Sequence, residues 1–224
     1  MYDRFGLFIN GAWTAAQDGK LAPVFSPVTE QSLGDCPVAA VADTDAAIAA
    51  ASAGFAAWRA TSGFDRADAL HRIADEMLRR TDEAARMISL ETGKPIAQAG
   101  REWALSIDQF RWYAEEARRI YGRIVESRVP GGRFEVHHEP VGIVAAFTAW
   151  NFPAALIARK VAPALAAGFG LLLTFLAHRL PNEQLTKEAV SLGTSRVFMA
   201  FTFVLAHMVH LAFALKWLNK DKRG

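Results

Sequence analysis

The chain has 224 residues, enough for one large domain with a hydrophobic core of its own. Hydrophobic residues make up 52% and charged residues 21%, which excludes a disordered or fibrous protein. The formal net charge of +2 offers no basic excess for nucleic acid, so no nucleic-acid partner is expected. A single cysteine, Cys36, excludes an internal disulfide and fits a reducing, cytoplasmic compartment.

The N-terminal residues are predicted to be extended. Residues 7–14 alternate around Asn10-Gly11, a dipeptide that favours a type I′ hairpin turn. A second extended pair is expected over 24–36, interrupted at Pro27. Together these segments would form an N-terminal strand arm.

Apolar residues then recur at helical spacing, which predicts a helical layer. Asp43 or Thr44 is expected to cap the first helix and Thr81 the third, while Pro95 suits the first position of the fourth. The four predicted helices cover residues 45–60, 66–80, 81–93 and 95–121.

A strand and a helix follow. Residues 133–148 are predicted to be strands, and 141–147 are apolar enough for burial on both faces. Asn151 then opens a helix that runs to about Ala167. A buried strand followed at once by a helix begins a doubly wound sheet, so we expect an α/β fold with the first β-α unit of a Rossmann-like sheet.

The composition changes at Gly168, where the formal net charge turns from −2 over residues 1–168 to +4 over 169–224. Residues 197–215 form a 19-residue run without formal charge between basic residues, long enough to cross a bilayer. A second apolar run over 161–177 is interrupted by Pro163, and its continuation over 169–180 is a candidate for the end of another span. We therefore predict a domain over 1–168 and an unrelated hydrophobic helical tail over 169–224, with a candidate transmembrane segment at 197–215.

Two histidine pairs are candidates for metal or haem ligands. His207 and His210 share one helical face of the tail, as haem ligands would or as polar residues facing a partner helix would. His137 and His138 have no second ligand cluster at metal spacing, so no metal site is expected.

A series of segments follows one another along the chain: FINGAW at 8–13, SPVT at 26–29, DTDAAIAAASAGFAAWRA at 43–60, ETGKP at 91–95, EPVGIVAAFTAWNFP at 139–153 and ARKVAPALAAG at 158–168. In this order they resemble the NAD(P)-dependent aldehyde dehydrogenase superfamily, and in particular its succinate-semialdehyde dehydrogenase branch. The resemblance covers residues 1–168, about three quarters of the chain, and the tail is unrecognised.

The resemblance implies roles for four residues. Asn151 would stabilise the oxyanion of the thiohemiacetal, although by itself an Asn before Phe-Pro also suits a helix N-cap. Thr148 and Trp150 would contact NAD or NADP, with a buried aromatic as the alternative for Trp150. Arg159 would bind the remote carboxylate of a semialdehyde, or else lie on an exposed helix face beside Lys160.

The ETGKP segment is expected to be structural. It combines a helix end, a glycine break and a helix start. Glu91 and Lys94 are interpreted as residues of a solvated terminus, with an acid–base pair as the alternative.

The chemistry that the resemblance implies needs a cysteine nucleophile and a glutamate base, whose motifs are absent here. Cys36 lies in the N-terminal arm and is interpreted as inert. We expect a fragment without turnover on a small-molecule aldehyde, with weak or no NAD(P) binding and a tendency to self-associate or aggregate. The alternatives are a membrane-anchored, non-catalytic interaction module and a haem-bearing membrane segment.

Overall fold

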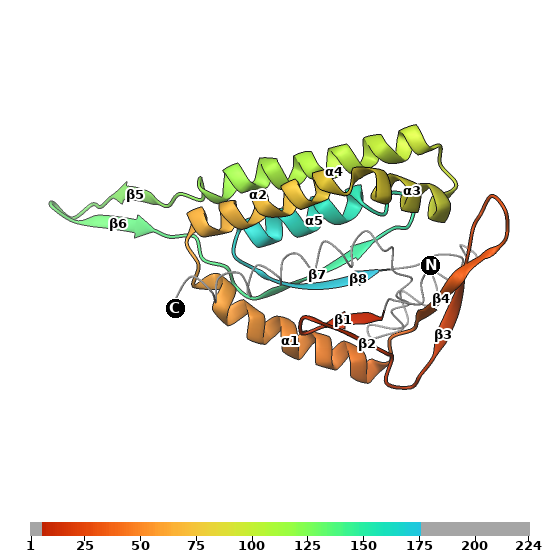
Figure 1. Ribbon diagram of the computed structural model, residues 1–224. Coiled ribbons are helices and arrows are strands. Elements are labelled where there is room, and N and C mark those ends of the chain that lie inside the picture. Colours follow the sequence, from red (N-terminus) through yellow and green to blue (C-terminus); the bar gives the residue numbers. More distant parts are fainter. Residues whose placement is uncertain (1–5, 176–224) are drawn as a thin grey trace, which may run out of the picture.

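The computed structural model describes residues 6–175, in which helices lie on both sides of a two-stranded parallel sheet (Figure 1). The sheet pairs β7 (Ile143–Thr148) with β8 (Gly170–Phe175), and α5 (Ala155–Ala166) connects them. On one side, α5 packs against the sheet and against α4 (Ile96–Ala117), which also contacts α2 (Gly63–Arg79) and α3 (Thr81–Thr92). On the other side α1 (Val41–Arg59) packs mainly against β8.

Two antiparallel hairpins form the predicted N-terminal strand arm. β1 (Leu7–Ile9) pairs with β2 (Ala12–Thr14), and the turn residues Asn10 and Gly11 have positive φ angles of 52° and 81°. This is the turn that the dipeptide predicts, because both central residues of a type I′ turn need positive φ. β3 (Leu21–Phe25) pairs with β4 (Ser32–Pro37), which confirms the second extended pair.

The four predicted helices are present, with shifted ends. α1 begins at Val41, so Asp43 lies inside its first turn, where Asp43 Oδ2 accepts a hydrogen bond from the Ala40 main-chain nitrogen at 2.8 Å. Ser62 caps α2 by accepting from the Asp65 main-chain nitrogen at 3.1 Å. The expected cap of α3 is wrong, because Thr81 Oγ1 donates backwards to the Leu78 carbonyl at 2.7 Å.

The fourth helix is shorter than predicted. Pro95 is its N-cap rather than its first residue, and α4 ends at Ala117, four residues before the predicted end at Tyr121. Residues after Ala117 lead into a hairpin, so the chain leaves the helical layer earlier than the periodicity suggests.

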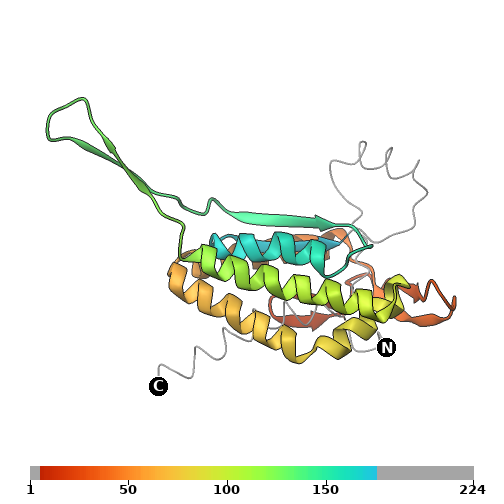
Figure 2. The same cartoon turned by 90° about the horizontal axis from the view of Figure 1, so that it is seen from above.

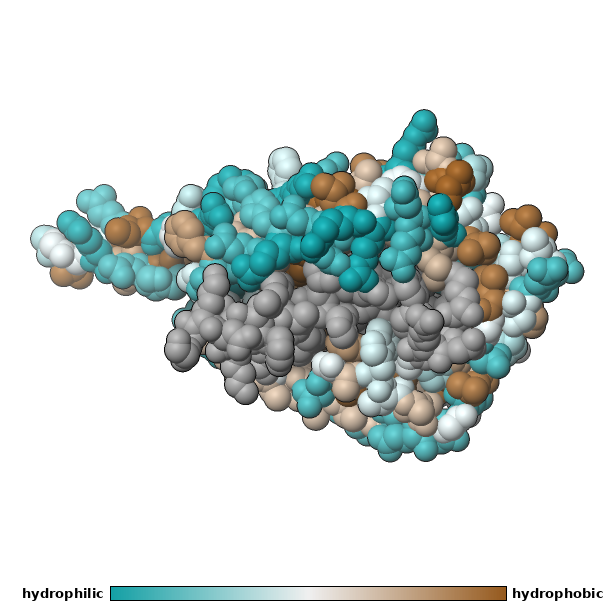
Figure 3. Space-filling view, in the orientation of Figure 1, coloured by the Kyte–Doolittle hydropathy of each residue, from teal (hydrophilic) through white to brown (hydrophobic). Residues whose placement is uncertain are grey.

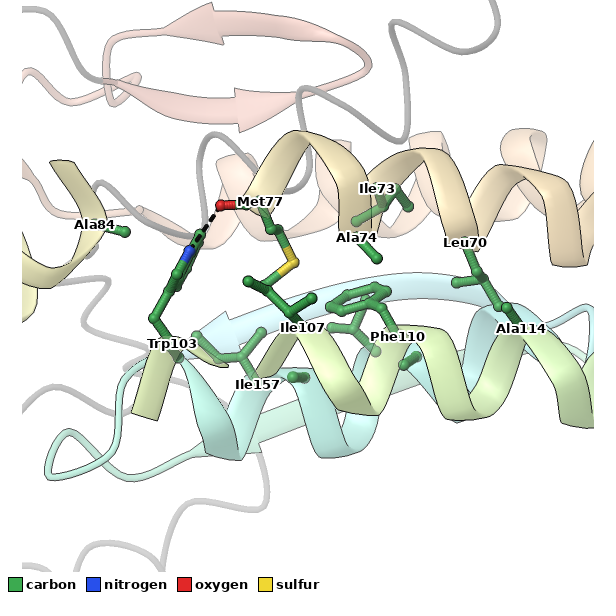
Figure 4. Packing of buried hydrophobic residues seen from close by; sticks show 14 of the residues in the cluster. Leu70, Ile73, Ala74, Met77, Ala84, Trp103, Ile107, Phe110, Ala114 and Ile157 are labelled. Atoms are coloured by element: carbon green, nitrogen blue, oxygen red, sulfur yellow. Dashed lines mark hydrogen bonds between the residues drawn. The ribbon is translucent and has the colours of Figure 1, made fainter. Parts of the chain in front are cut away.

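The hydrophobic core lies between α2, α3, α4 and α5 (Figure 4). Trp103 and Phe110 of α4 are its large aromatic side chains, and the Trp103 indole donates to the Met77 carbonyl at 2.8 Å. Alanines elsewhere in the cluster allow the helices to approach closely. The larger aliphatic members of the cluster are Leu70, Ile73, Met77, Met87, Ile88, Ile107, Ile157 and Val161.

A long hairpin of β5 (Arg123–Glu126) and β6 (Arg133–Val136) extends away from the helical layer, as Figure 2 shows from above. β6 lies within the strand region predicted over residues 133–148, whereas no strand is predicted at the position of β5. The hairpin carries exposed apolar side chains among polar ones, including Ile124 at 67% and Phe134 at 60% exposure. The space-filling view shows the same mixture of hydrophilic and hydrophobic residues along the β5–β6 hairpin (Figure 3).

β7 is less buried than the sequence predicts. Only Ala146 and Thr148 of the strand are buried, and Phe147 is 48% exposed. The reason is that α5 covers one face while α1 covers mainly the neighbouring strand β8.

The parallel sheet extends beyond the predicted domain boundary. β8 pairs with β7 from Ile143↔Gly170 to Thr148↔Phe175, so the first β-α unit is completed to β-α-β. A boundary after Gly168 therefore falls within this unit, and residues 170–175 form a strand where a helical tail was expected. An apolar run of this length fits a buried parallel strand as well as the end of a membrane span.

Side chains from α1 and α2 anchor the C-terminal end of α5. Trp58 Nε1 donates to the Leu165 carbonyl at 3.0 Å, and Arg66 Nε donates to the Ala166 carbonyl at 2.9 Å. Burial lowers the pKa of the Arg66 guanidinium, which still keeps its charge because arginine titrates far above neutral pH. The Arg66 bond satisfies a carbonyl that the last helical turn leaves unpaired, whereas the Leu165 carbonyl also accepts from the Gly168 main-chain nitrogen at 3.1 Å.

Across residues 6–175, none of the helices combines the length and the apolar character needed to cross a membrane. The candidate transmembrane segment at 197–215, together with His207 and His210, lies outside the described residues.

Candidate functional site

The loop between β7 and α5, residues 149–154, contains the candidate site. It follows the carboxyl end of a strand in a parallel sheet, which is where α/β proteins place their ligand sites. Thr148 closes β7 before the loop, and Asn151 lies in its middle. Both are residues to which the sequence assigns a functional role.

Asn151 is not the N-cap of α5. The helix begins at Ala155, and its N-cap is Ala154, which has no side chain able to accept a hydrogen bond. The Asn151 side chain is exposed and has no hydrogen-bond partner among the described residues. The N-cap alternative for Asn151 is therefore wrong, and its carboxamide is available for another interaction.

Glu102 of α4 takes the capping role instead. Its Oε1 accepts from the main-chain nitrogens of Ala154 and Ala155, at 2.9 and 3.2 Å. The residue is 3% exposed, so the carboxylate is a buried anion at the positive end of α5. An acidic side chain from one helix thus satisfies N–H groups that begin another.

Lys94 is the counter-charge of this buried carboxylate. Its Nζ forms an ion pair with Glu102 Oε2 and donates to the Asn151 main-chain oxygen at 3.0 Å. The ammonium also lies 4.3 Å from the centroid of the Phe152 ring, within the range of a cation–π contact. Lys94 and Glu102 are named the Lys94–Glu102 pair below.

These contacts change the interpretation of ETGKP. The helix end and glycine break are confirmed, because α3 ends at Thr92 and Gly93 follows as its C-cap in the left-handed conformation, with φ of 72°. The expectation of a solvated terminus is wrong for Lys94, whose side chain is only 14% exposed. Its carboxylate partner is Glu102, eight residues along the chain.

Gly93 sets the position of Lys94, and its replacement is predicted to be destabilising. An added Cβ would lie 3.0 Å from Val28 Cγ2 and 3.1 Å from Pro27 Cγ, on top of the left-handed backbone penalty. We expect Gly93→Ala to cost at least about 1–2 kcal/mol of unfolding free energy, measured by urea denaturation.

Gly100 provides the matched control for this prediction. It lies within α4, and a Cβ there would meet no atom within 4 Å. Gly100→Ala is expected to stabilise the chain by about 0.5–1 kcal/mol, because alanine is the better helix former. Equal effects of the two substitutions would contradict the role assigned to Gly93.

The other predicted residues lie around the loop. Thr148 is 4% exposed, and its Oγ1 has no hydrogen-bond partner among the described residues. Trp150 is 47% exposed, so the alternative of a buried aromatic does not hold. Arg159 is exposed on α5 and makes no ion pair within residues 6–175.

Glu102 has no predicted role, although its position along the helix carries a signal. Glu102 falls on the same helical face as Ala99, Trp103 and Ser106, all of which are buried. A carboxylate within an apolar stripe indicates a buried partner. The described part of the chain holds no group of three or more metal-ligating side chains.

Cys36 lies elsewhere in the fold. It belongs to β4, where it pairs with Ala22 of β3 in a different sheet from β7, and it is 3% exposed. A buried thiol in the N-terminal arm agrees with its interpretation as an inert cysteine.

Comparison with known proteins extends this picture. The chain is 41% identical over 166 residues to the glutarate-semialdehyde dehydrogenase of Pseudomonas aeruginosa and 41% identical over 165 residues to the succinate-semialdehyde dehydrogenase [NADP(+)] of Escherichia coli. Each alignment covers 74% of this chain and 34% of the relative, so the chain spans about a third of their length.

Another relative aligns over more of the chain. The non-phosphorylating aspartate-semialdehyde dehydrogenase of Halomonas elongata is 36% identical over 216 residues, which are 96% of this chain and 43% of the relative. That alignment therefore reaches past Phe175, into the segment predicted to be an unrelated tail.

Similarity in structure covers the same region. The crystal structure of the succinate-semialdehyde dehydrogenase from Burkholderia pseudomallei superimposes with a TM-score of 0.75 at 41% identity, over 77% of this chain and 36% of that one. The family model described as "Aldehyde dehydrogenase family" matches residues 13–173, which include the first four residues of β8. The chain belongs to the aldehyde dehydrogenase family.

Proposed function

We propose that this chain carries the oxyanion and substrate-carboxylate part of the active site of an NAD(P)-dependent semialdehyde dehydrogenase. The reaction would oxidise a carboxylated semialdehyde to the acid. The observation that carries the proposal is the Asn151 carboxamide, which has no hydrogen-bond partner within residues 6–175 and lies in a loop before a helix that Glu102 already caps. The family membership and the semialdehyde dehydrogenases among the relatives support the choice of reaction.

Asn151 is proposed to stabilise negative charge on the carbonyl oxygen of the substrate. An amide N–H aimed at a developing oxyanion acts strongly where water is excluded, because the donor needs no reorganisation during the reaction. The exposed side chain at the carboxyl end of β7 supports this role.

Arg159 is proposed to bind the remote carboxylate of the substrate. A guanidinium presents two parallel N–H donors to the two oxygens of a carboxylate. Its exposure and the lack of an ion-pair partner within the described residues support the proposal, since the fork is not occupied by another side chain.

Thr148 and Trp150 fit the nicotinamide end of NAD(P). Thr148 presents a buried hydroxyl that no described residue satisfies, and Trp150, two residues later in the sequence, presents a ring that is 47% exposed. A bound NAD(P)⁺ would accept the hydride of the oxidised aldehyde. The E. coli relative is named for NADP(+). Both NADP and NAD are cofactors to test with this chain.

The chain by itself is proposed to lack turnover. Its single cysteine is buried in β4, and the motifs of the family's nucleophile and base are absent from the sequence. Both groups would have to come from outside these 224 residues. The most direct test mixes this chain with the C-terminal two thirds of the P. aeruginosa relative and follows NAD(P)⁺ reduction with glutarate or succinate semialdehyde. An inactive mixture containing a soluble complex would contradict the proposed function.

Asn151→Ala is expected to lower kcat of the active mixture about 10²–10³-fold, the loss seen when one oxyanion donor is removed. Gln98→Ala, an exposed amide on α4, is the matched control and should leave kcat unchanged. Equal rates for the two variants would remove Asn151 from the active site.

Arg159→Met should raise KM for a semialdehyde in the same mixture, because it removes the charged partner of the substrate carboxylate. The loss of such a hydrogen-bonded charge pair is worth about 2–5 kcal/mol when desolvated. KM for an uncharged aldehyde should stay the same. Lys160→Met, the exposed neighbour on α5, is the control, and an equal change for both aldehydes would contradict the carboxylate role.

A further inference from the structure

The Lys94–Glu102 pair holds both ends of the segment that begins at Asn151. Lys94 Nζ donates to the main-chain oxygen of Asn151, and Glu102 Oε1 accepts from the main-chain nitrogens of Ala154 and Ala155. The two side chains are 14% and 2% exposed, so both charges are largely removed from water. One ion pair from α4 and the turn before it therefore fixes a short loop at two points.

We propose that Lys94 and Glu102 are positioning residues for the carboxamide of Asn151. The inference rests on the oxyanion role proposed above for Asn151, and it assigns to the ETGKP lysine a function in the active site. Neither residue is proposed to touch the substrate.

Glu102 frees the Asn151 side chain from capping. Asparagine is among the preferred residues at a helix N-terminus, because its side-chain oxygen can accept from the first N–H groups. Here those N–H groups at Ala154 and Ala155 already bond to the Glu102 carboxylate, a charged and stronger acceptor. The Asn151 carboxamide is thereby left without an intramolecular partner among the described residues.

Lys94 fixes the backbone from which that carboxamide projects. Its bond to the Asn151 carbonyl, 3.0 Å long, restrains rotation of the peptide that joins Asn151 to Phe152. The contact of the same ammonium with the Phe152 ring, at 4.3 Å, holds the next side chain in place. A donor held in this way is preorganised, which is the condition for oxyanion stabilisation without a reorganisation cost.

A purely structural role makes a different prediction. If the pair only stabilises the fold, removing both charges together should restore the stability that is lost when one charge is removed alone. The Asn151 side-chain signals should then stay unchanged. If it positions Asn151, the double variant Lys94→Met/Glu102→Gln should fold and yet displace the carboxamide. The glutamine keeps an oxygen for Ala154 and Ala155, while methionine cannot donate to the Asn151 carbonyl.

The test is nuclear magnetic resonance on the full chain labelled with ¹⁵N-asparagine. The sequence has four asparagines, so few side-chain amide signals are expected, and Asn151→Asp identifies the one from Asn151. Far-UV circular dichroism and urea denaturation establish that each variant is folded. Lys160→Met, an exposed lysine on α5, is the matched control.

We expect the Asn151 side-chain signals to shift or broaden in Lys94→Met/Glu102→Gln. They should stay in place in Lys160→Met and in Lys94→Arg, which keeps a donor for the Asn151 carbonyl. Unchanged signals in the folded double variant would overturn the inference. A shifted signal together with an inactive reconstituted mixture would instead support the positioning and contradict the proposed function, so the two failures are distinguishable.

Discussion

Replacing Glu102 with alanine is expected to lower the free energy of unfolding by about 3–5 kcal/mol, the cost of breaking a buried ion pair by removing one partner. The substitution leaves Lys94, whose side chain is 14% exposed, without its counter-charge. It also removes the acceptor of the Ala154 and Ala155 N–H groups at the start of α5. Both losses act on the contact between α4 and α5, so the whole helical layer should be affected.

Urea denaturation followed by circular dichroism measures this effect, with Asp68→Ala as the control. Asp68 pairs with Arg118 at 3.0 Å, but the side chains are 60% and 37% exposed. An exposed pair is worth about 0–1 kcal/mol, so the control should change little. Glu102→Gln, which keeps the acceptor oxygen, should fall between the two. A Glu102→Ala variant as stable as Asp68→Ala would show that the buried carboxylate is not important for folding.

Replacing Trp103 with alanine is expected to cost about 3–5 kcal/mol, as large-to-small substitutions of buried aromatic residues do. Trp103 is 2% exposed within the cluster of α2, α3, α4 and α5, so its removal leaves a cavity that rigid helices fill only in part. It also removes the hydrogen bond from the indole to the Met77 carbonyl, which Figure 4 shows.

Trp112 supplies the control from the same helix. It is 65% exposed, and Trp112→Ala should change the unfolding free energy by about 0.5 kcal/mol or less, as surface substitutions usually do. The comparison holds residue type and helix constant, so the difference measures burial alone. Tryptophan fluorescence gives a second readout, because the blue-shifted signal of a buried indole should disappear only in Trp103→Ala. Similar losses in both variants would place the core elsewhere.

Turns, helix ends and contiguous motifs were predicted correctly, because each depends on a few neighbouring residues. Asn10-Gly11 specified its turn, because these residues tolerate positive φ. Gly93 marked the end of α3 for the same reason. The β-α start at 143–166 and the family resemblance were likewise evident from contiguous motifs.

The pairing of strands could not be predicted from such local signals. β8 was interpreted as part of a membrane-like run, because a buried strand and an apolar helix both consist of consecutive hydrophobic residues. Its partner β7 is separated from it in the sequence by the whole of α5. Only the parallel pairing of the two strands distinguishes a strand from the end of a membrane span. The β5 strand was missed because its residues, all exposed, are held by pairing with β6 and not by burial.

By itself the sequence determined the family, the order of the helices and the position of Asn151 in the segment that follows a strand. Each of these depends on residues that are adjacent in the chain. Only the tertiary structure decided that Lys94 and Glu102 are buried partners, that Glu102 and not Asn151 caps α5, and that the sheet continues past Gly168. The physical reason is that burial and charge pairing depend on which helices pack together, and that packing joins residues far apart in sequence.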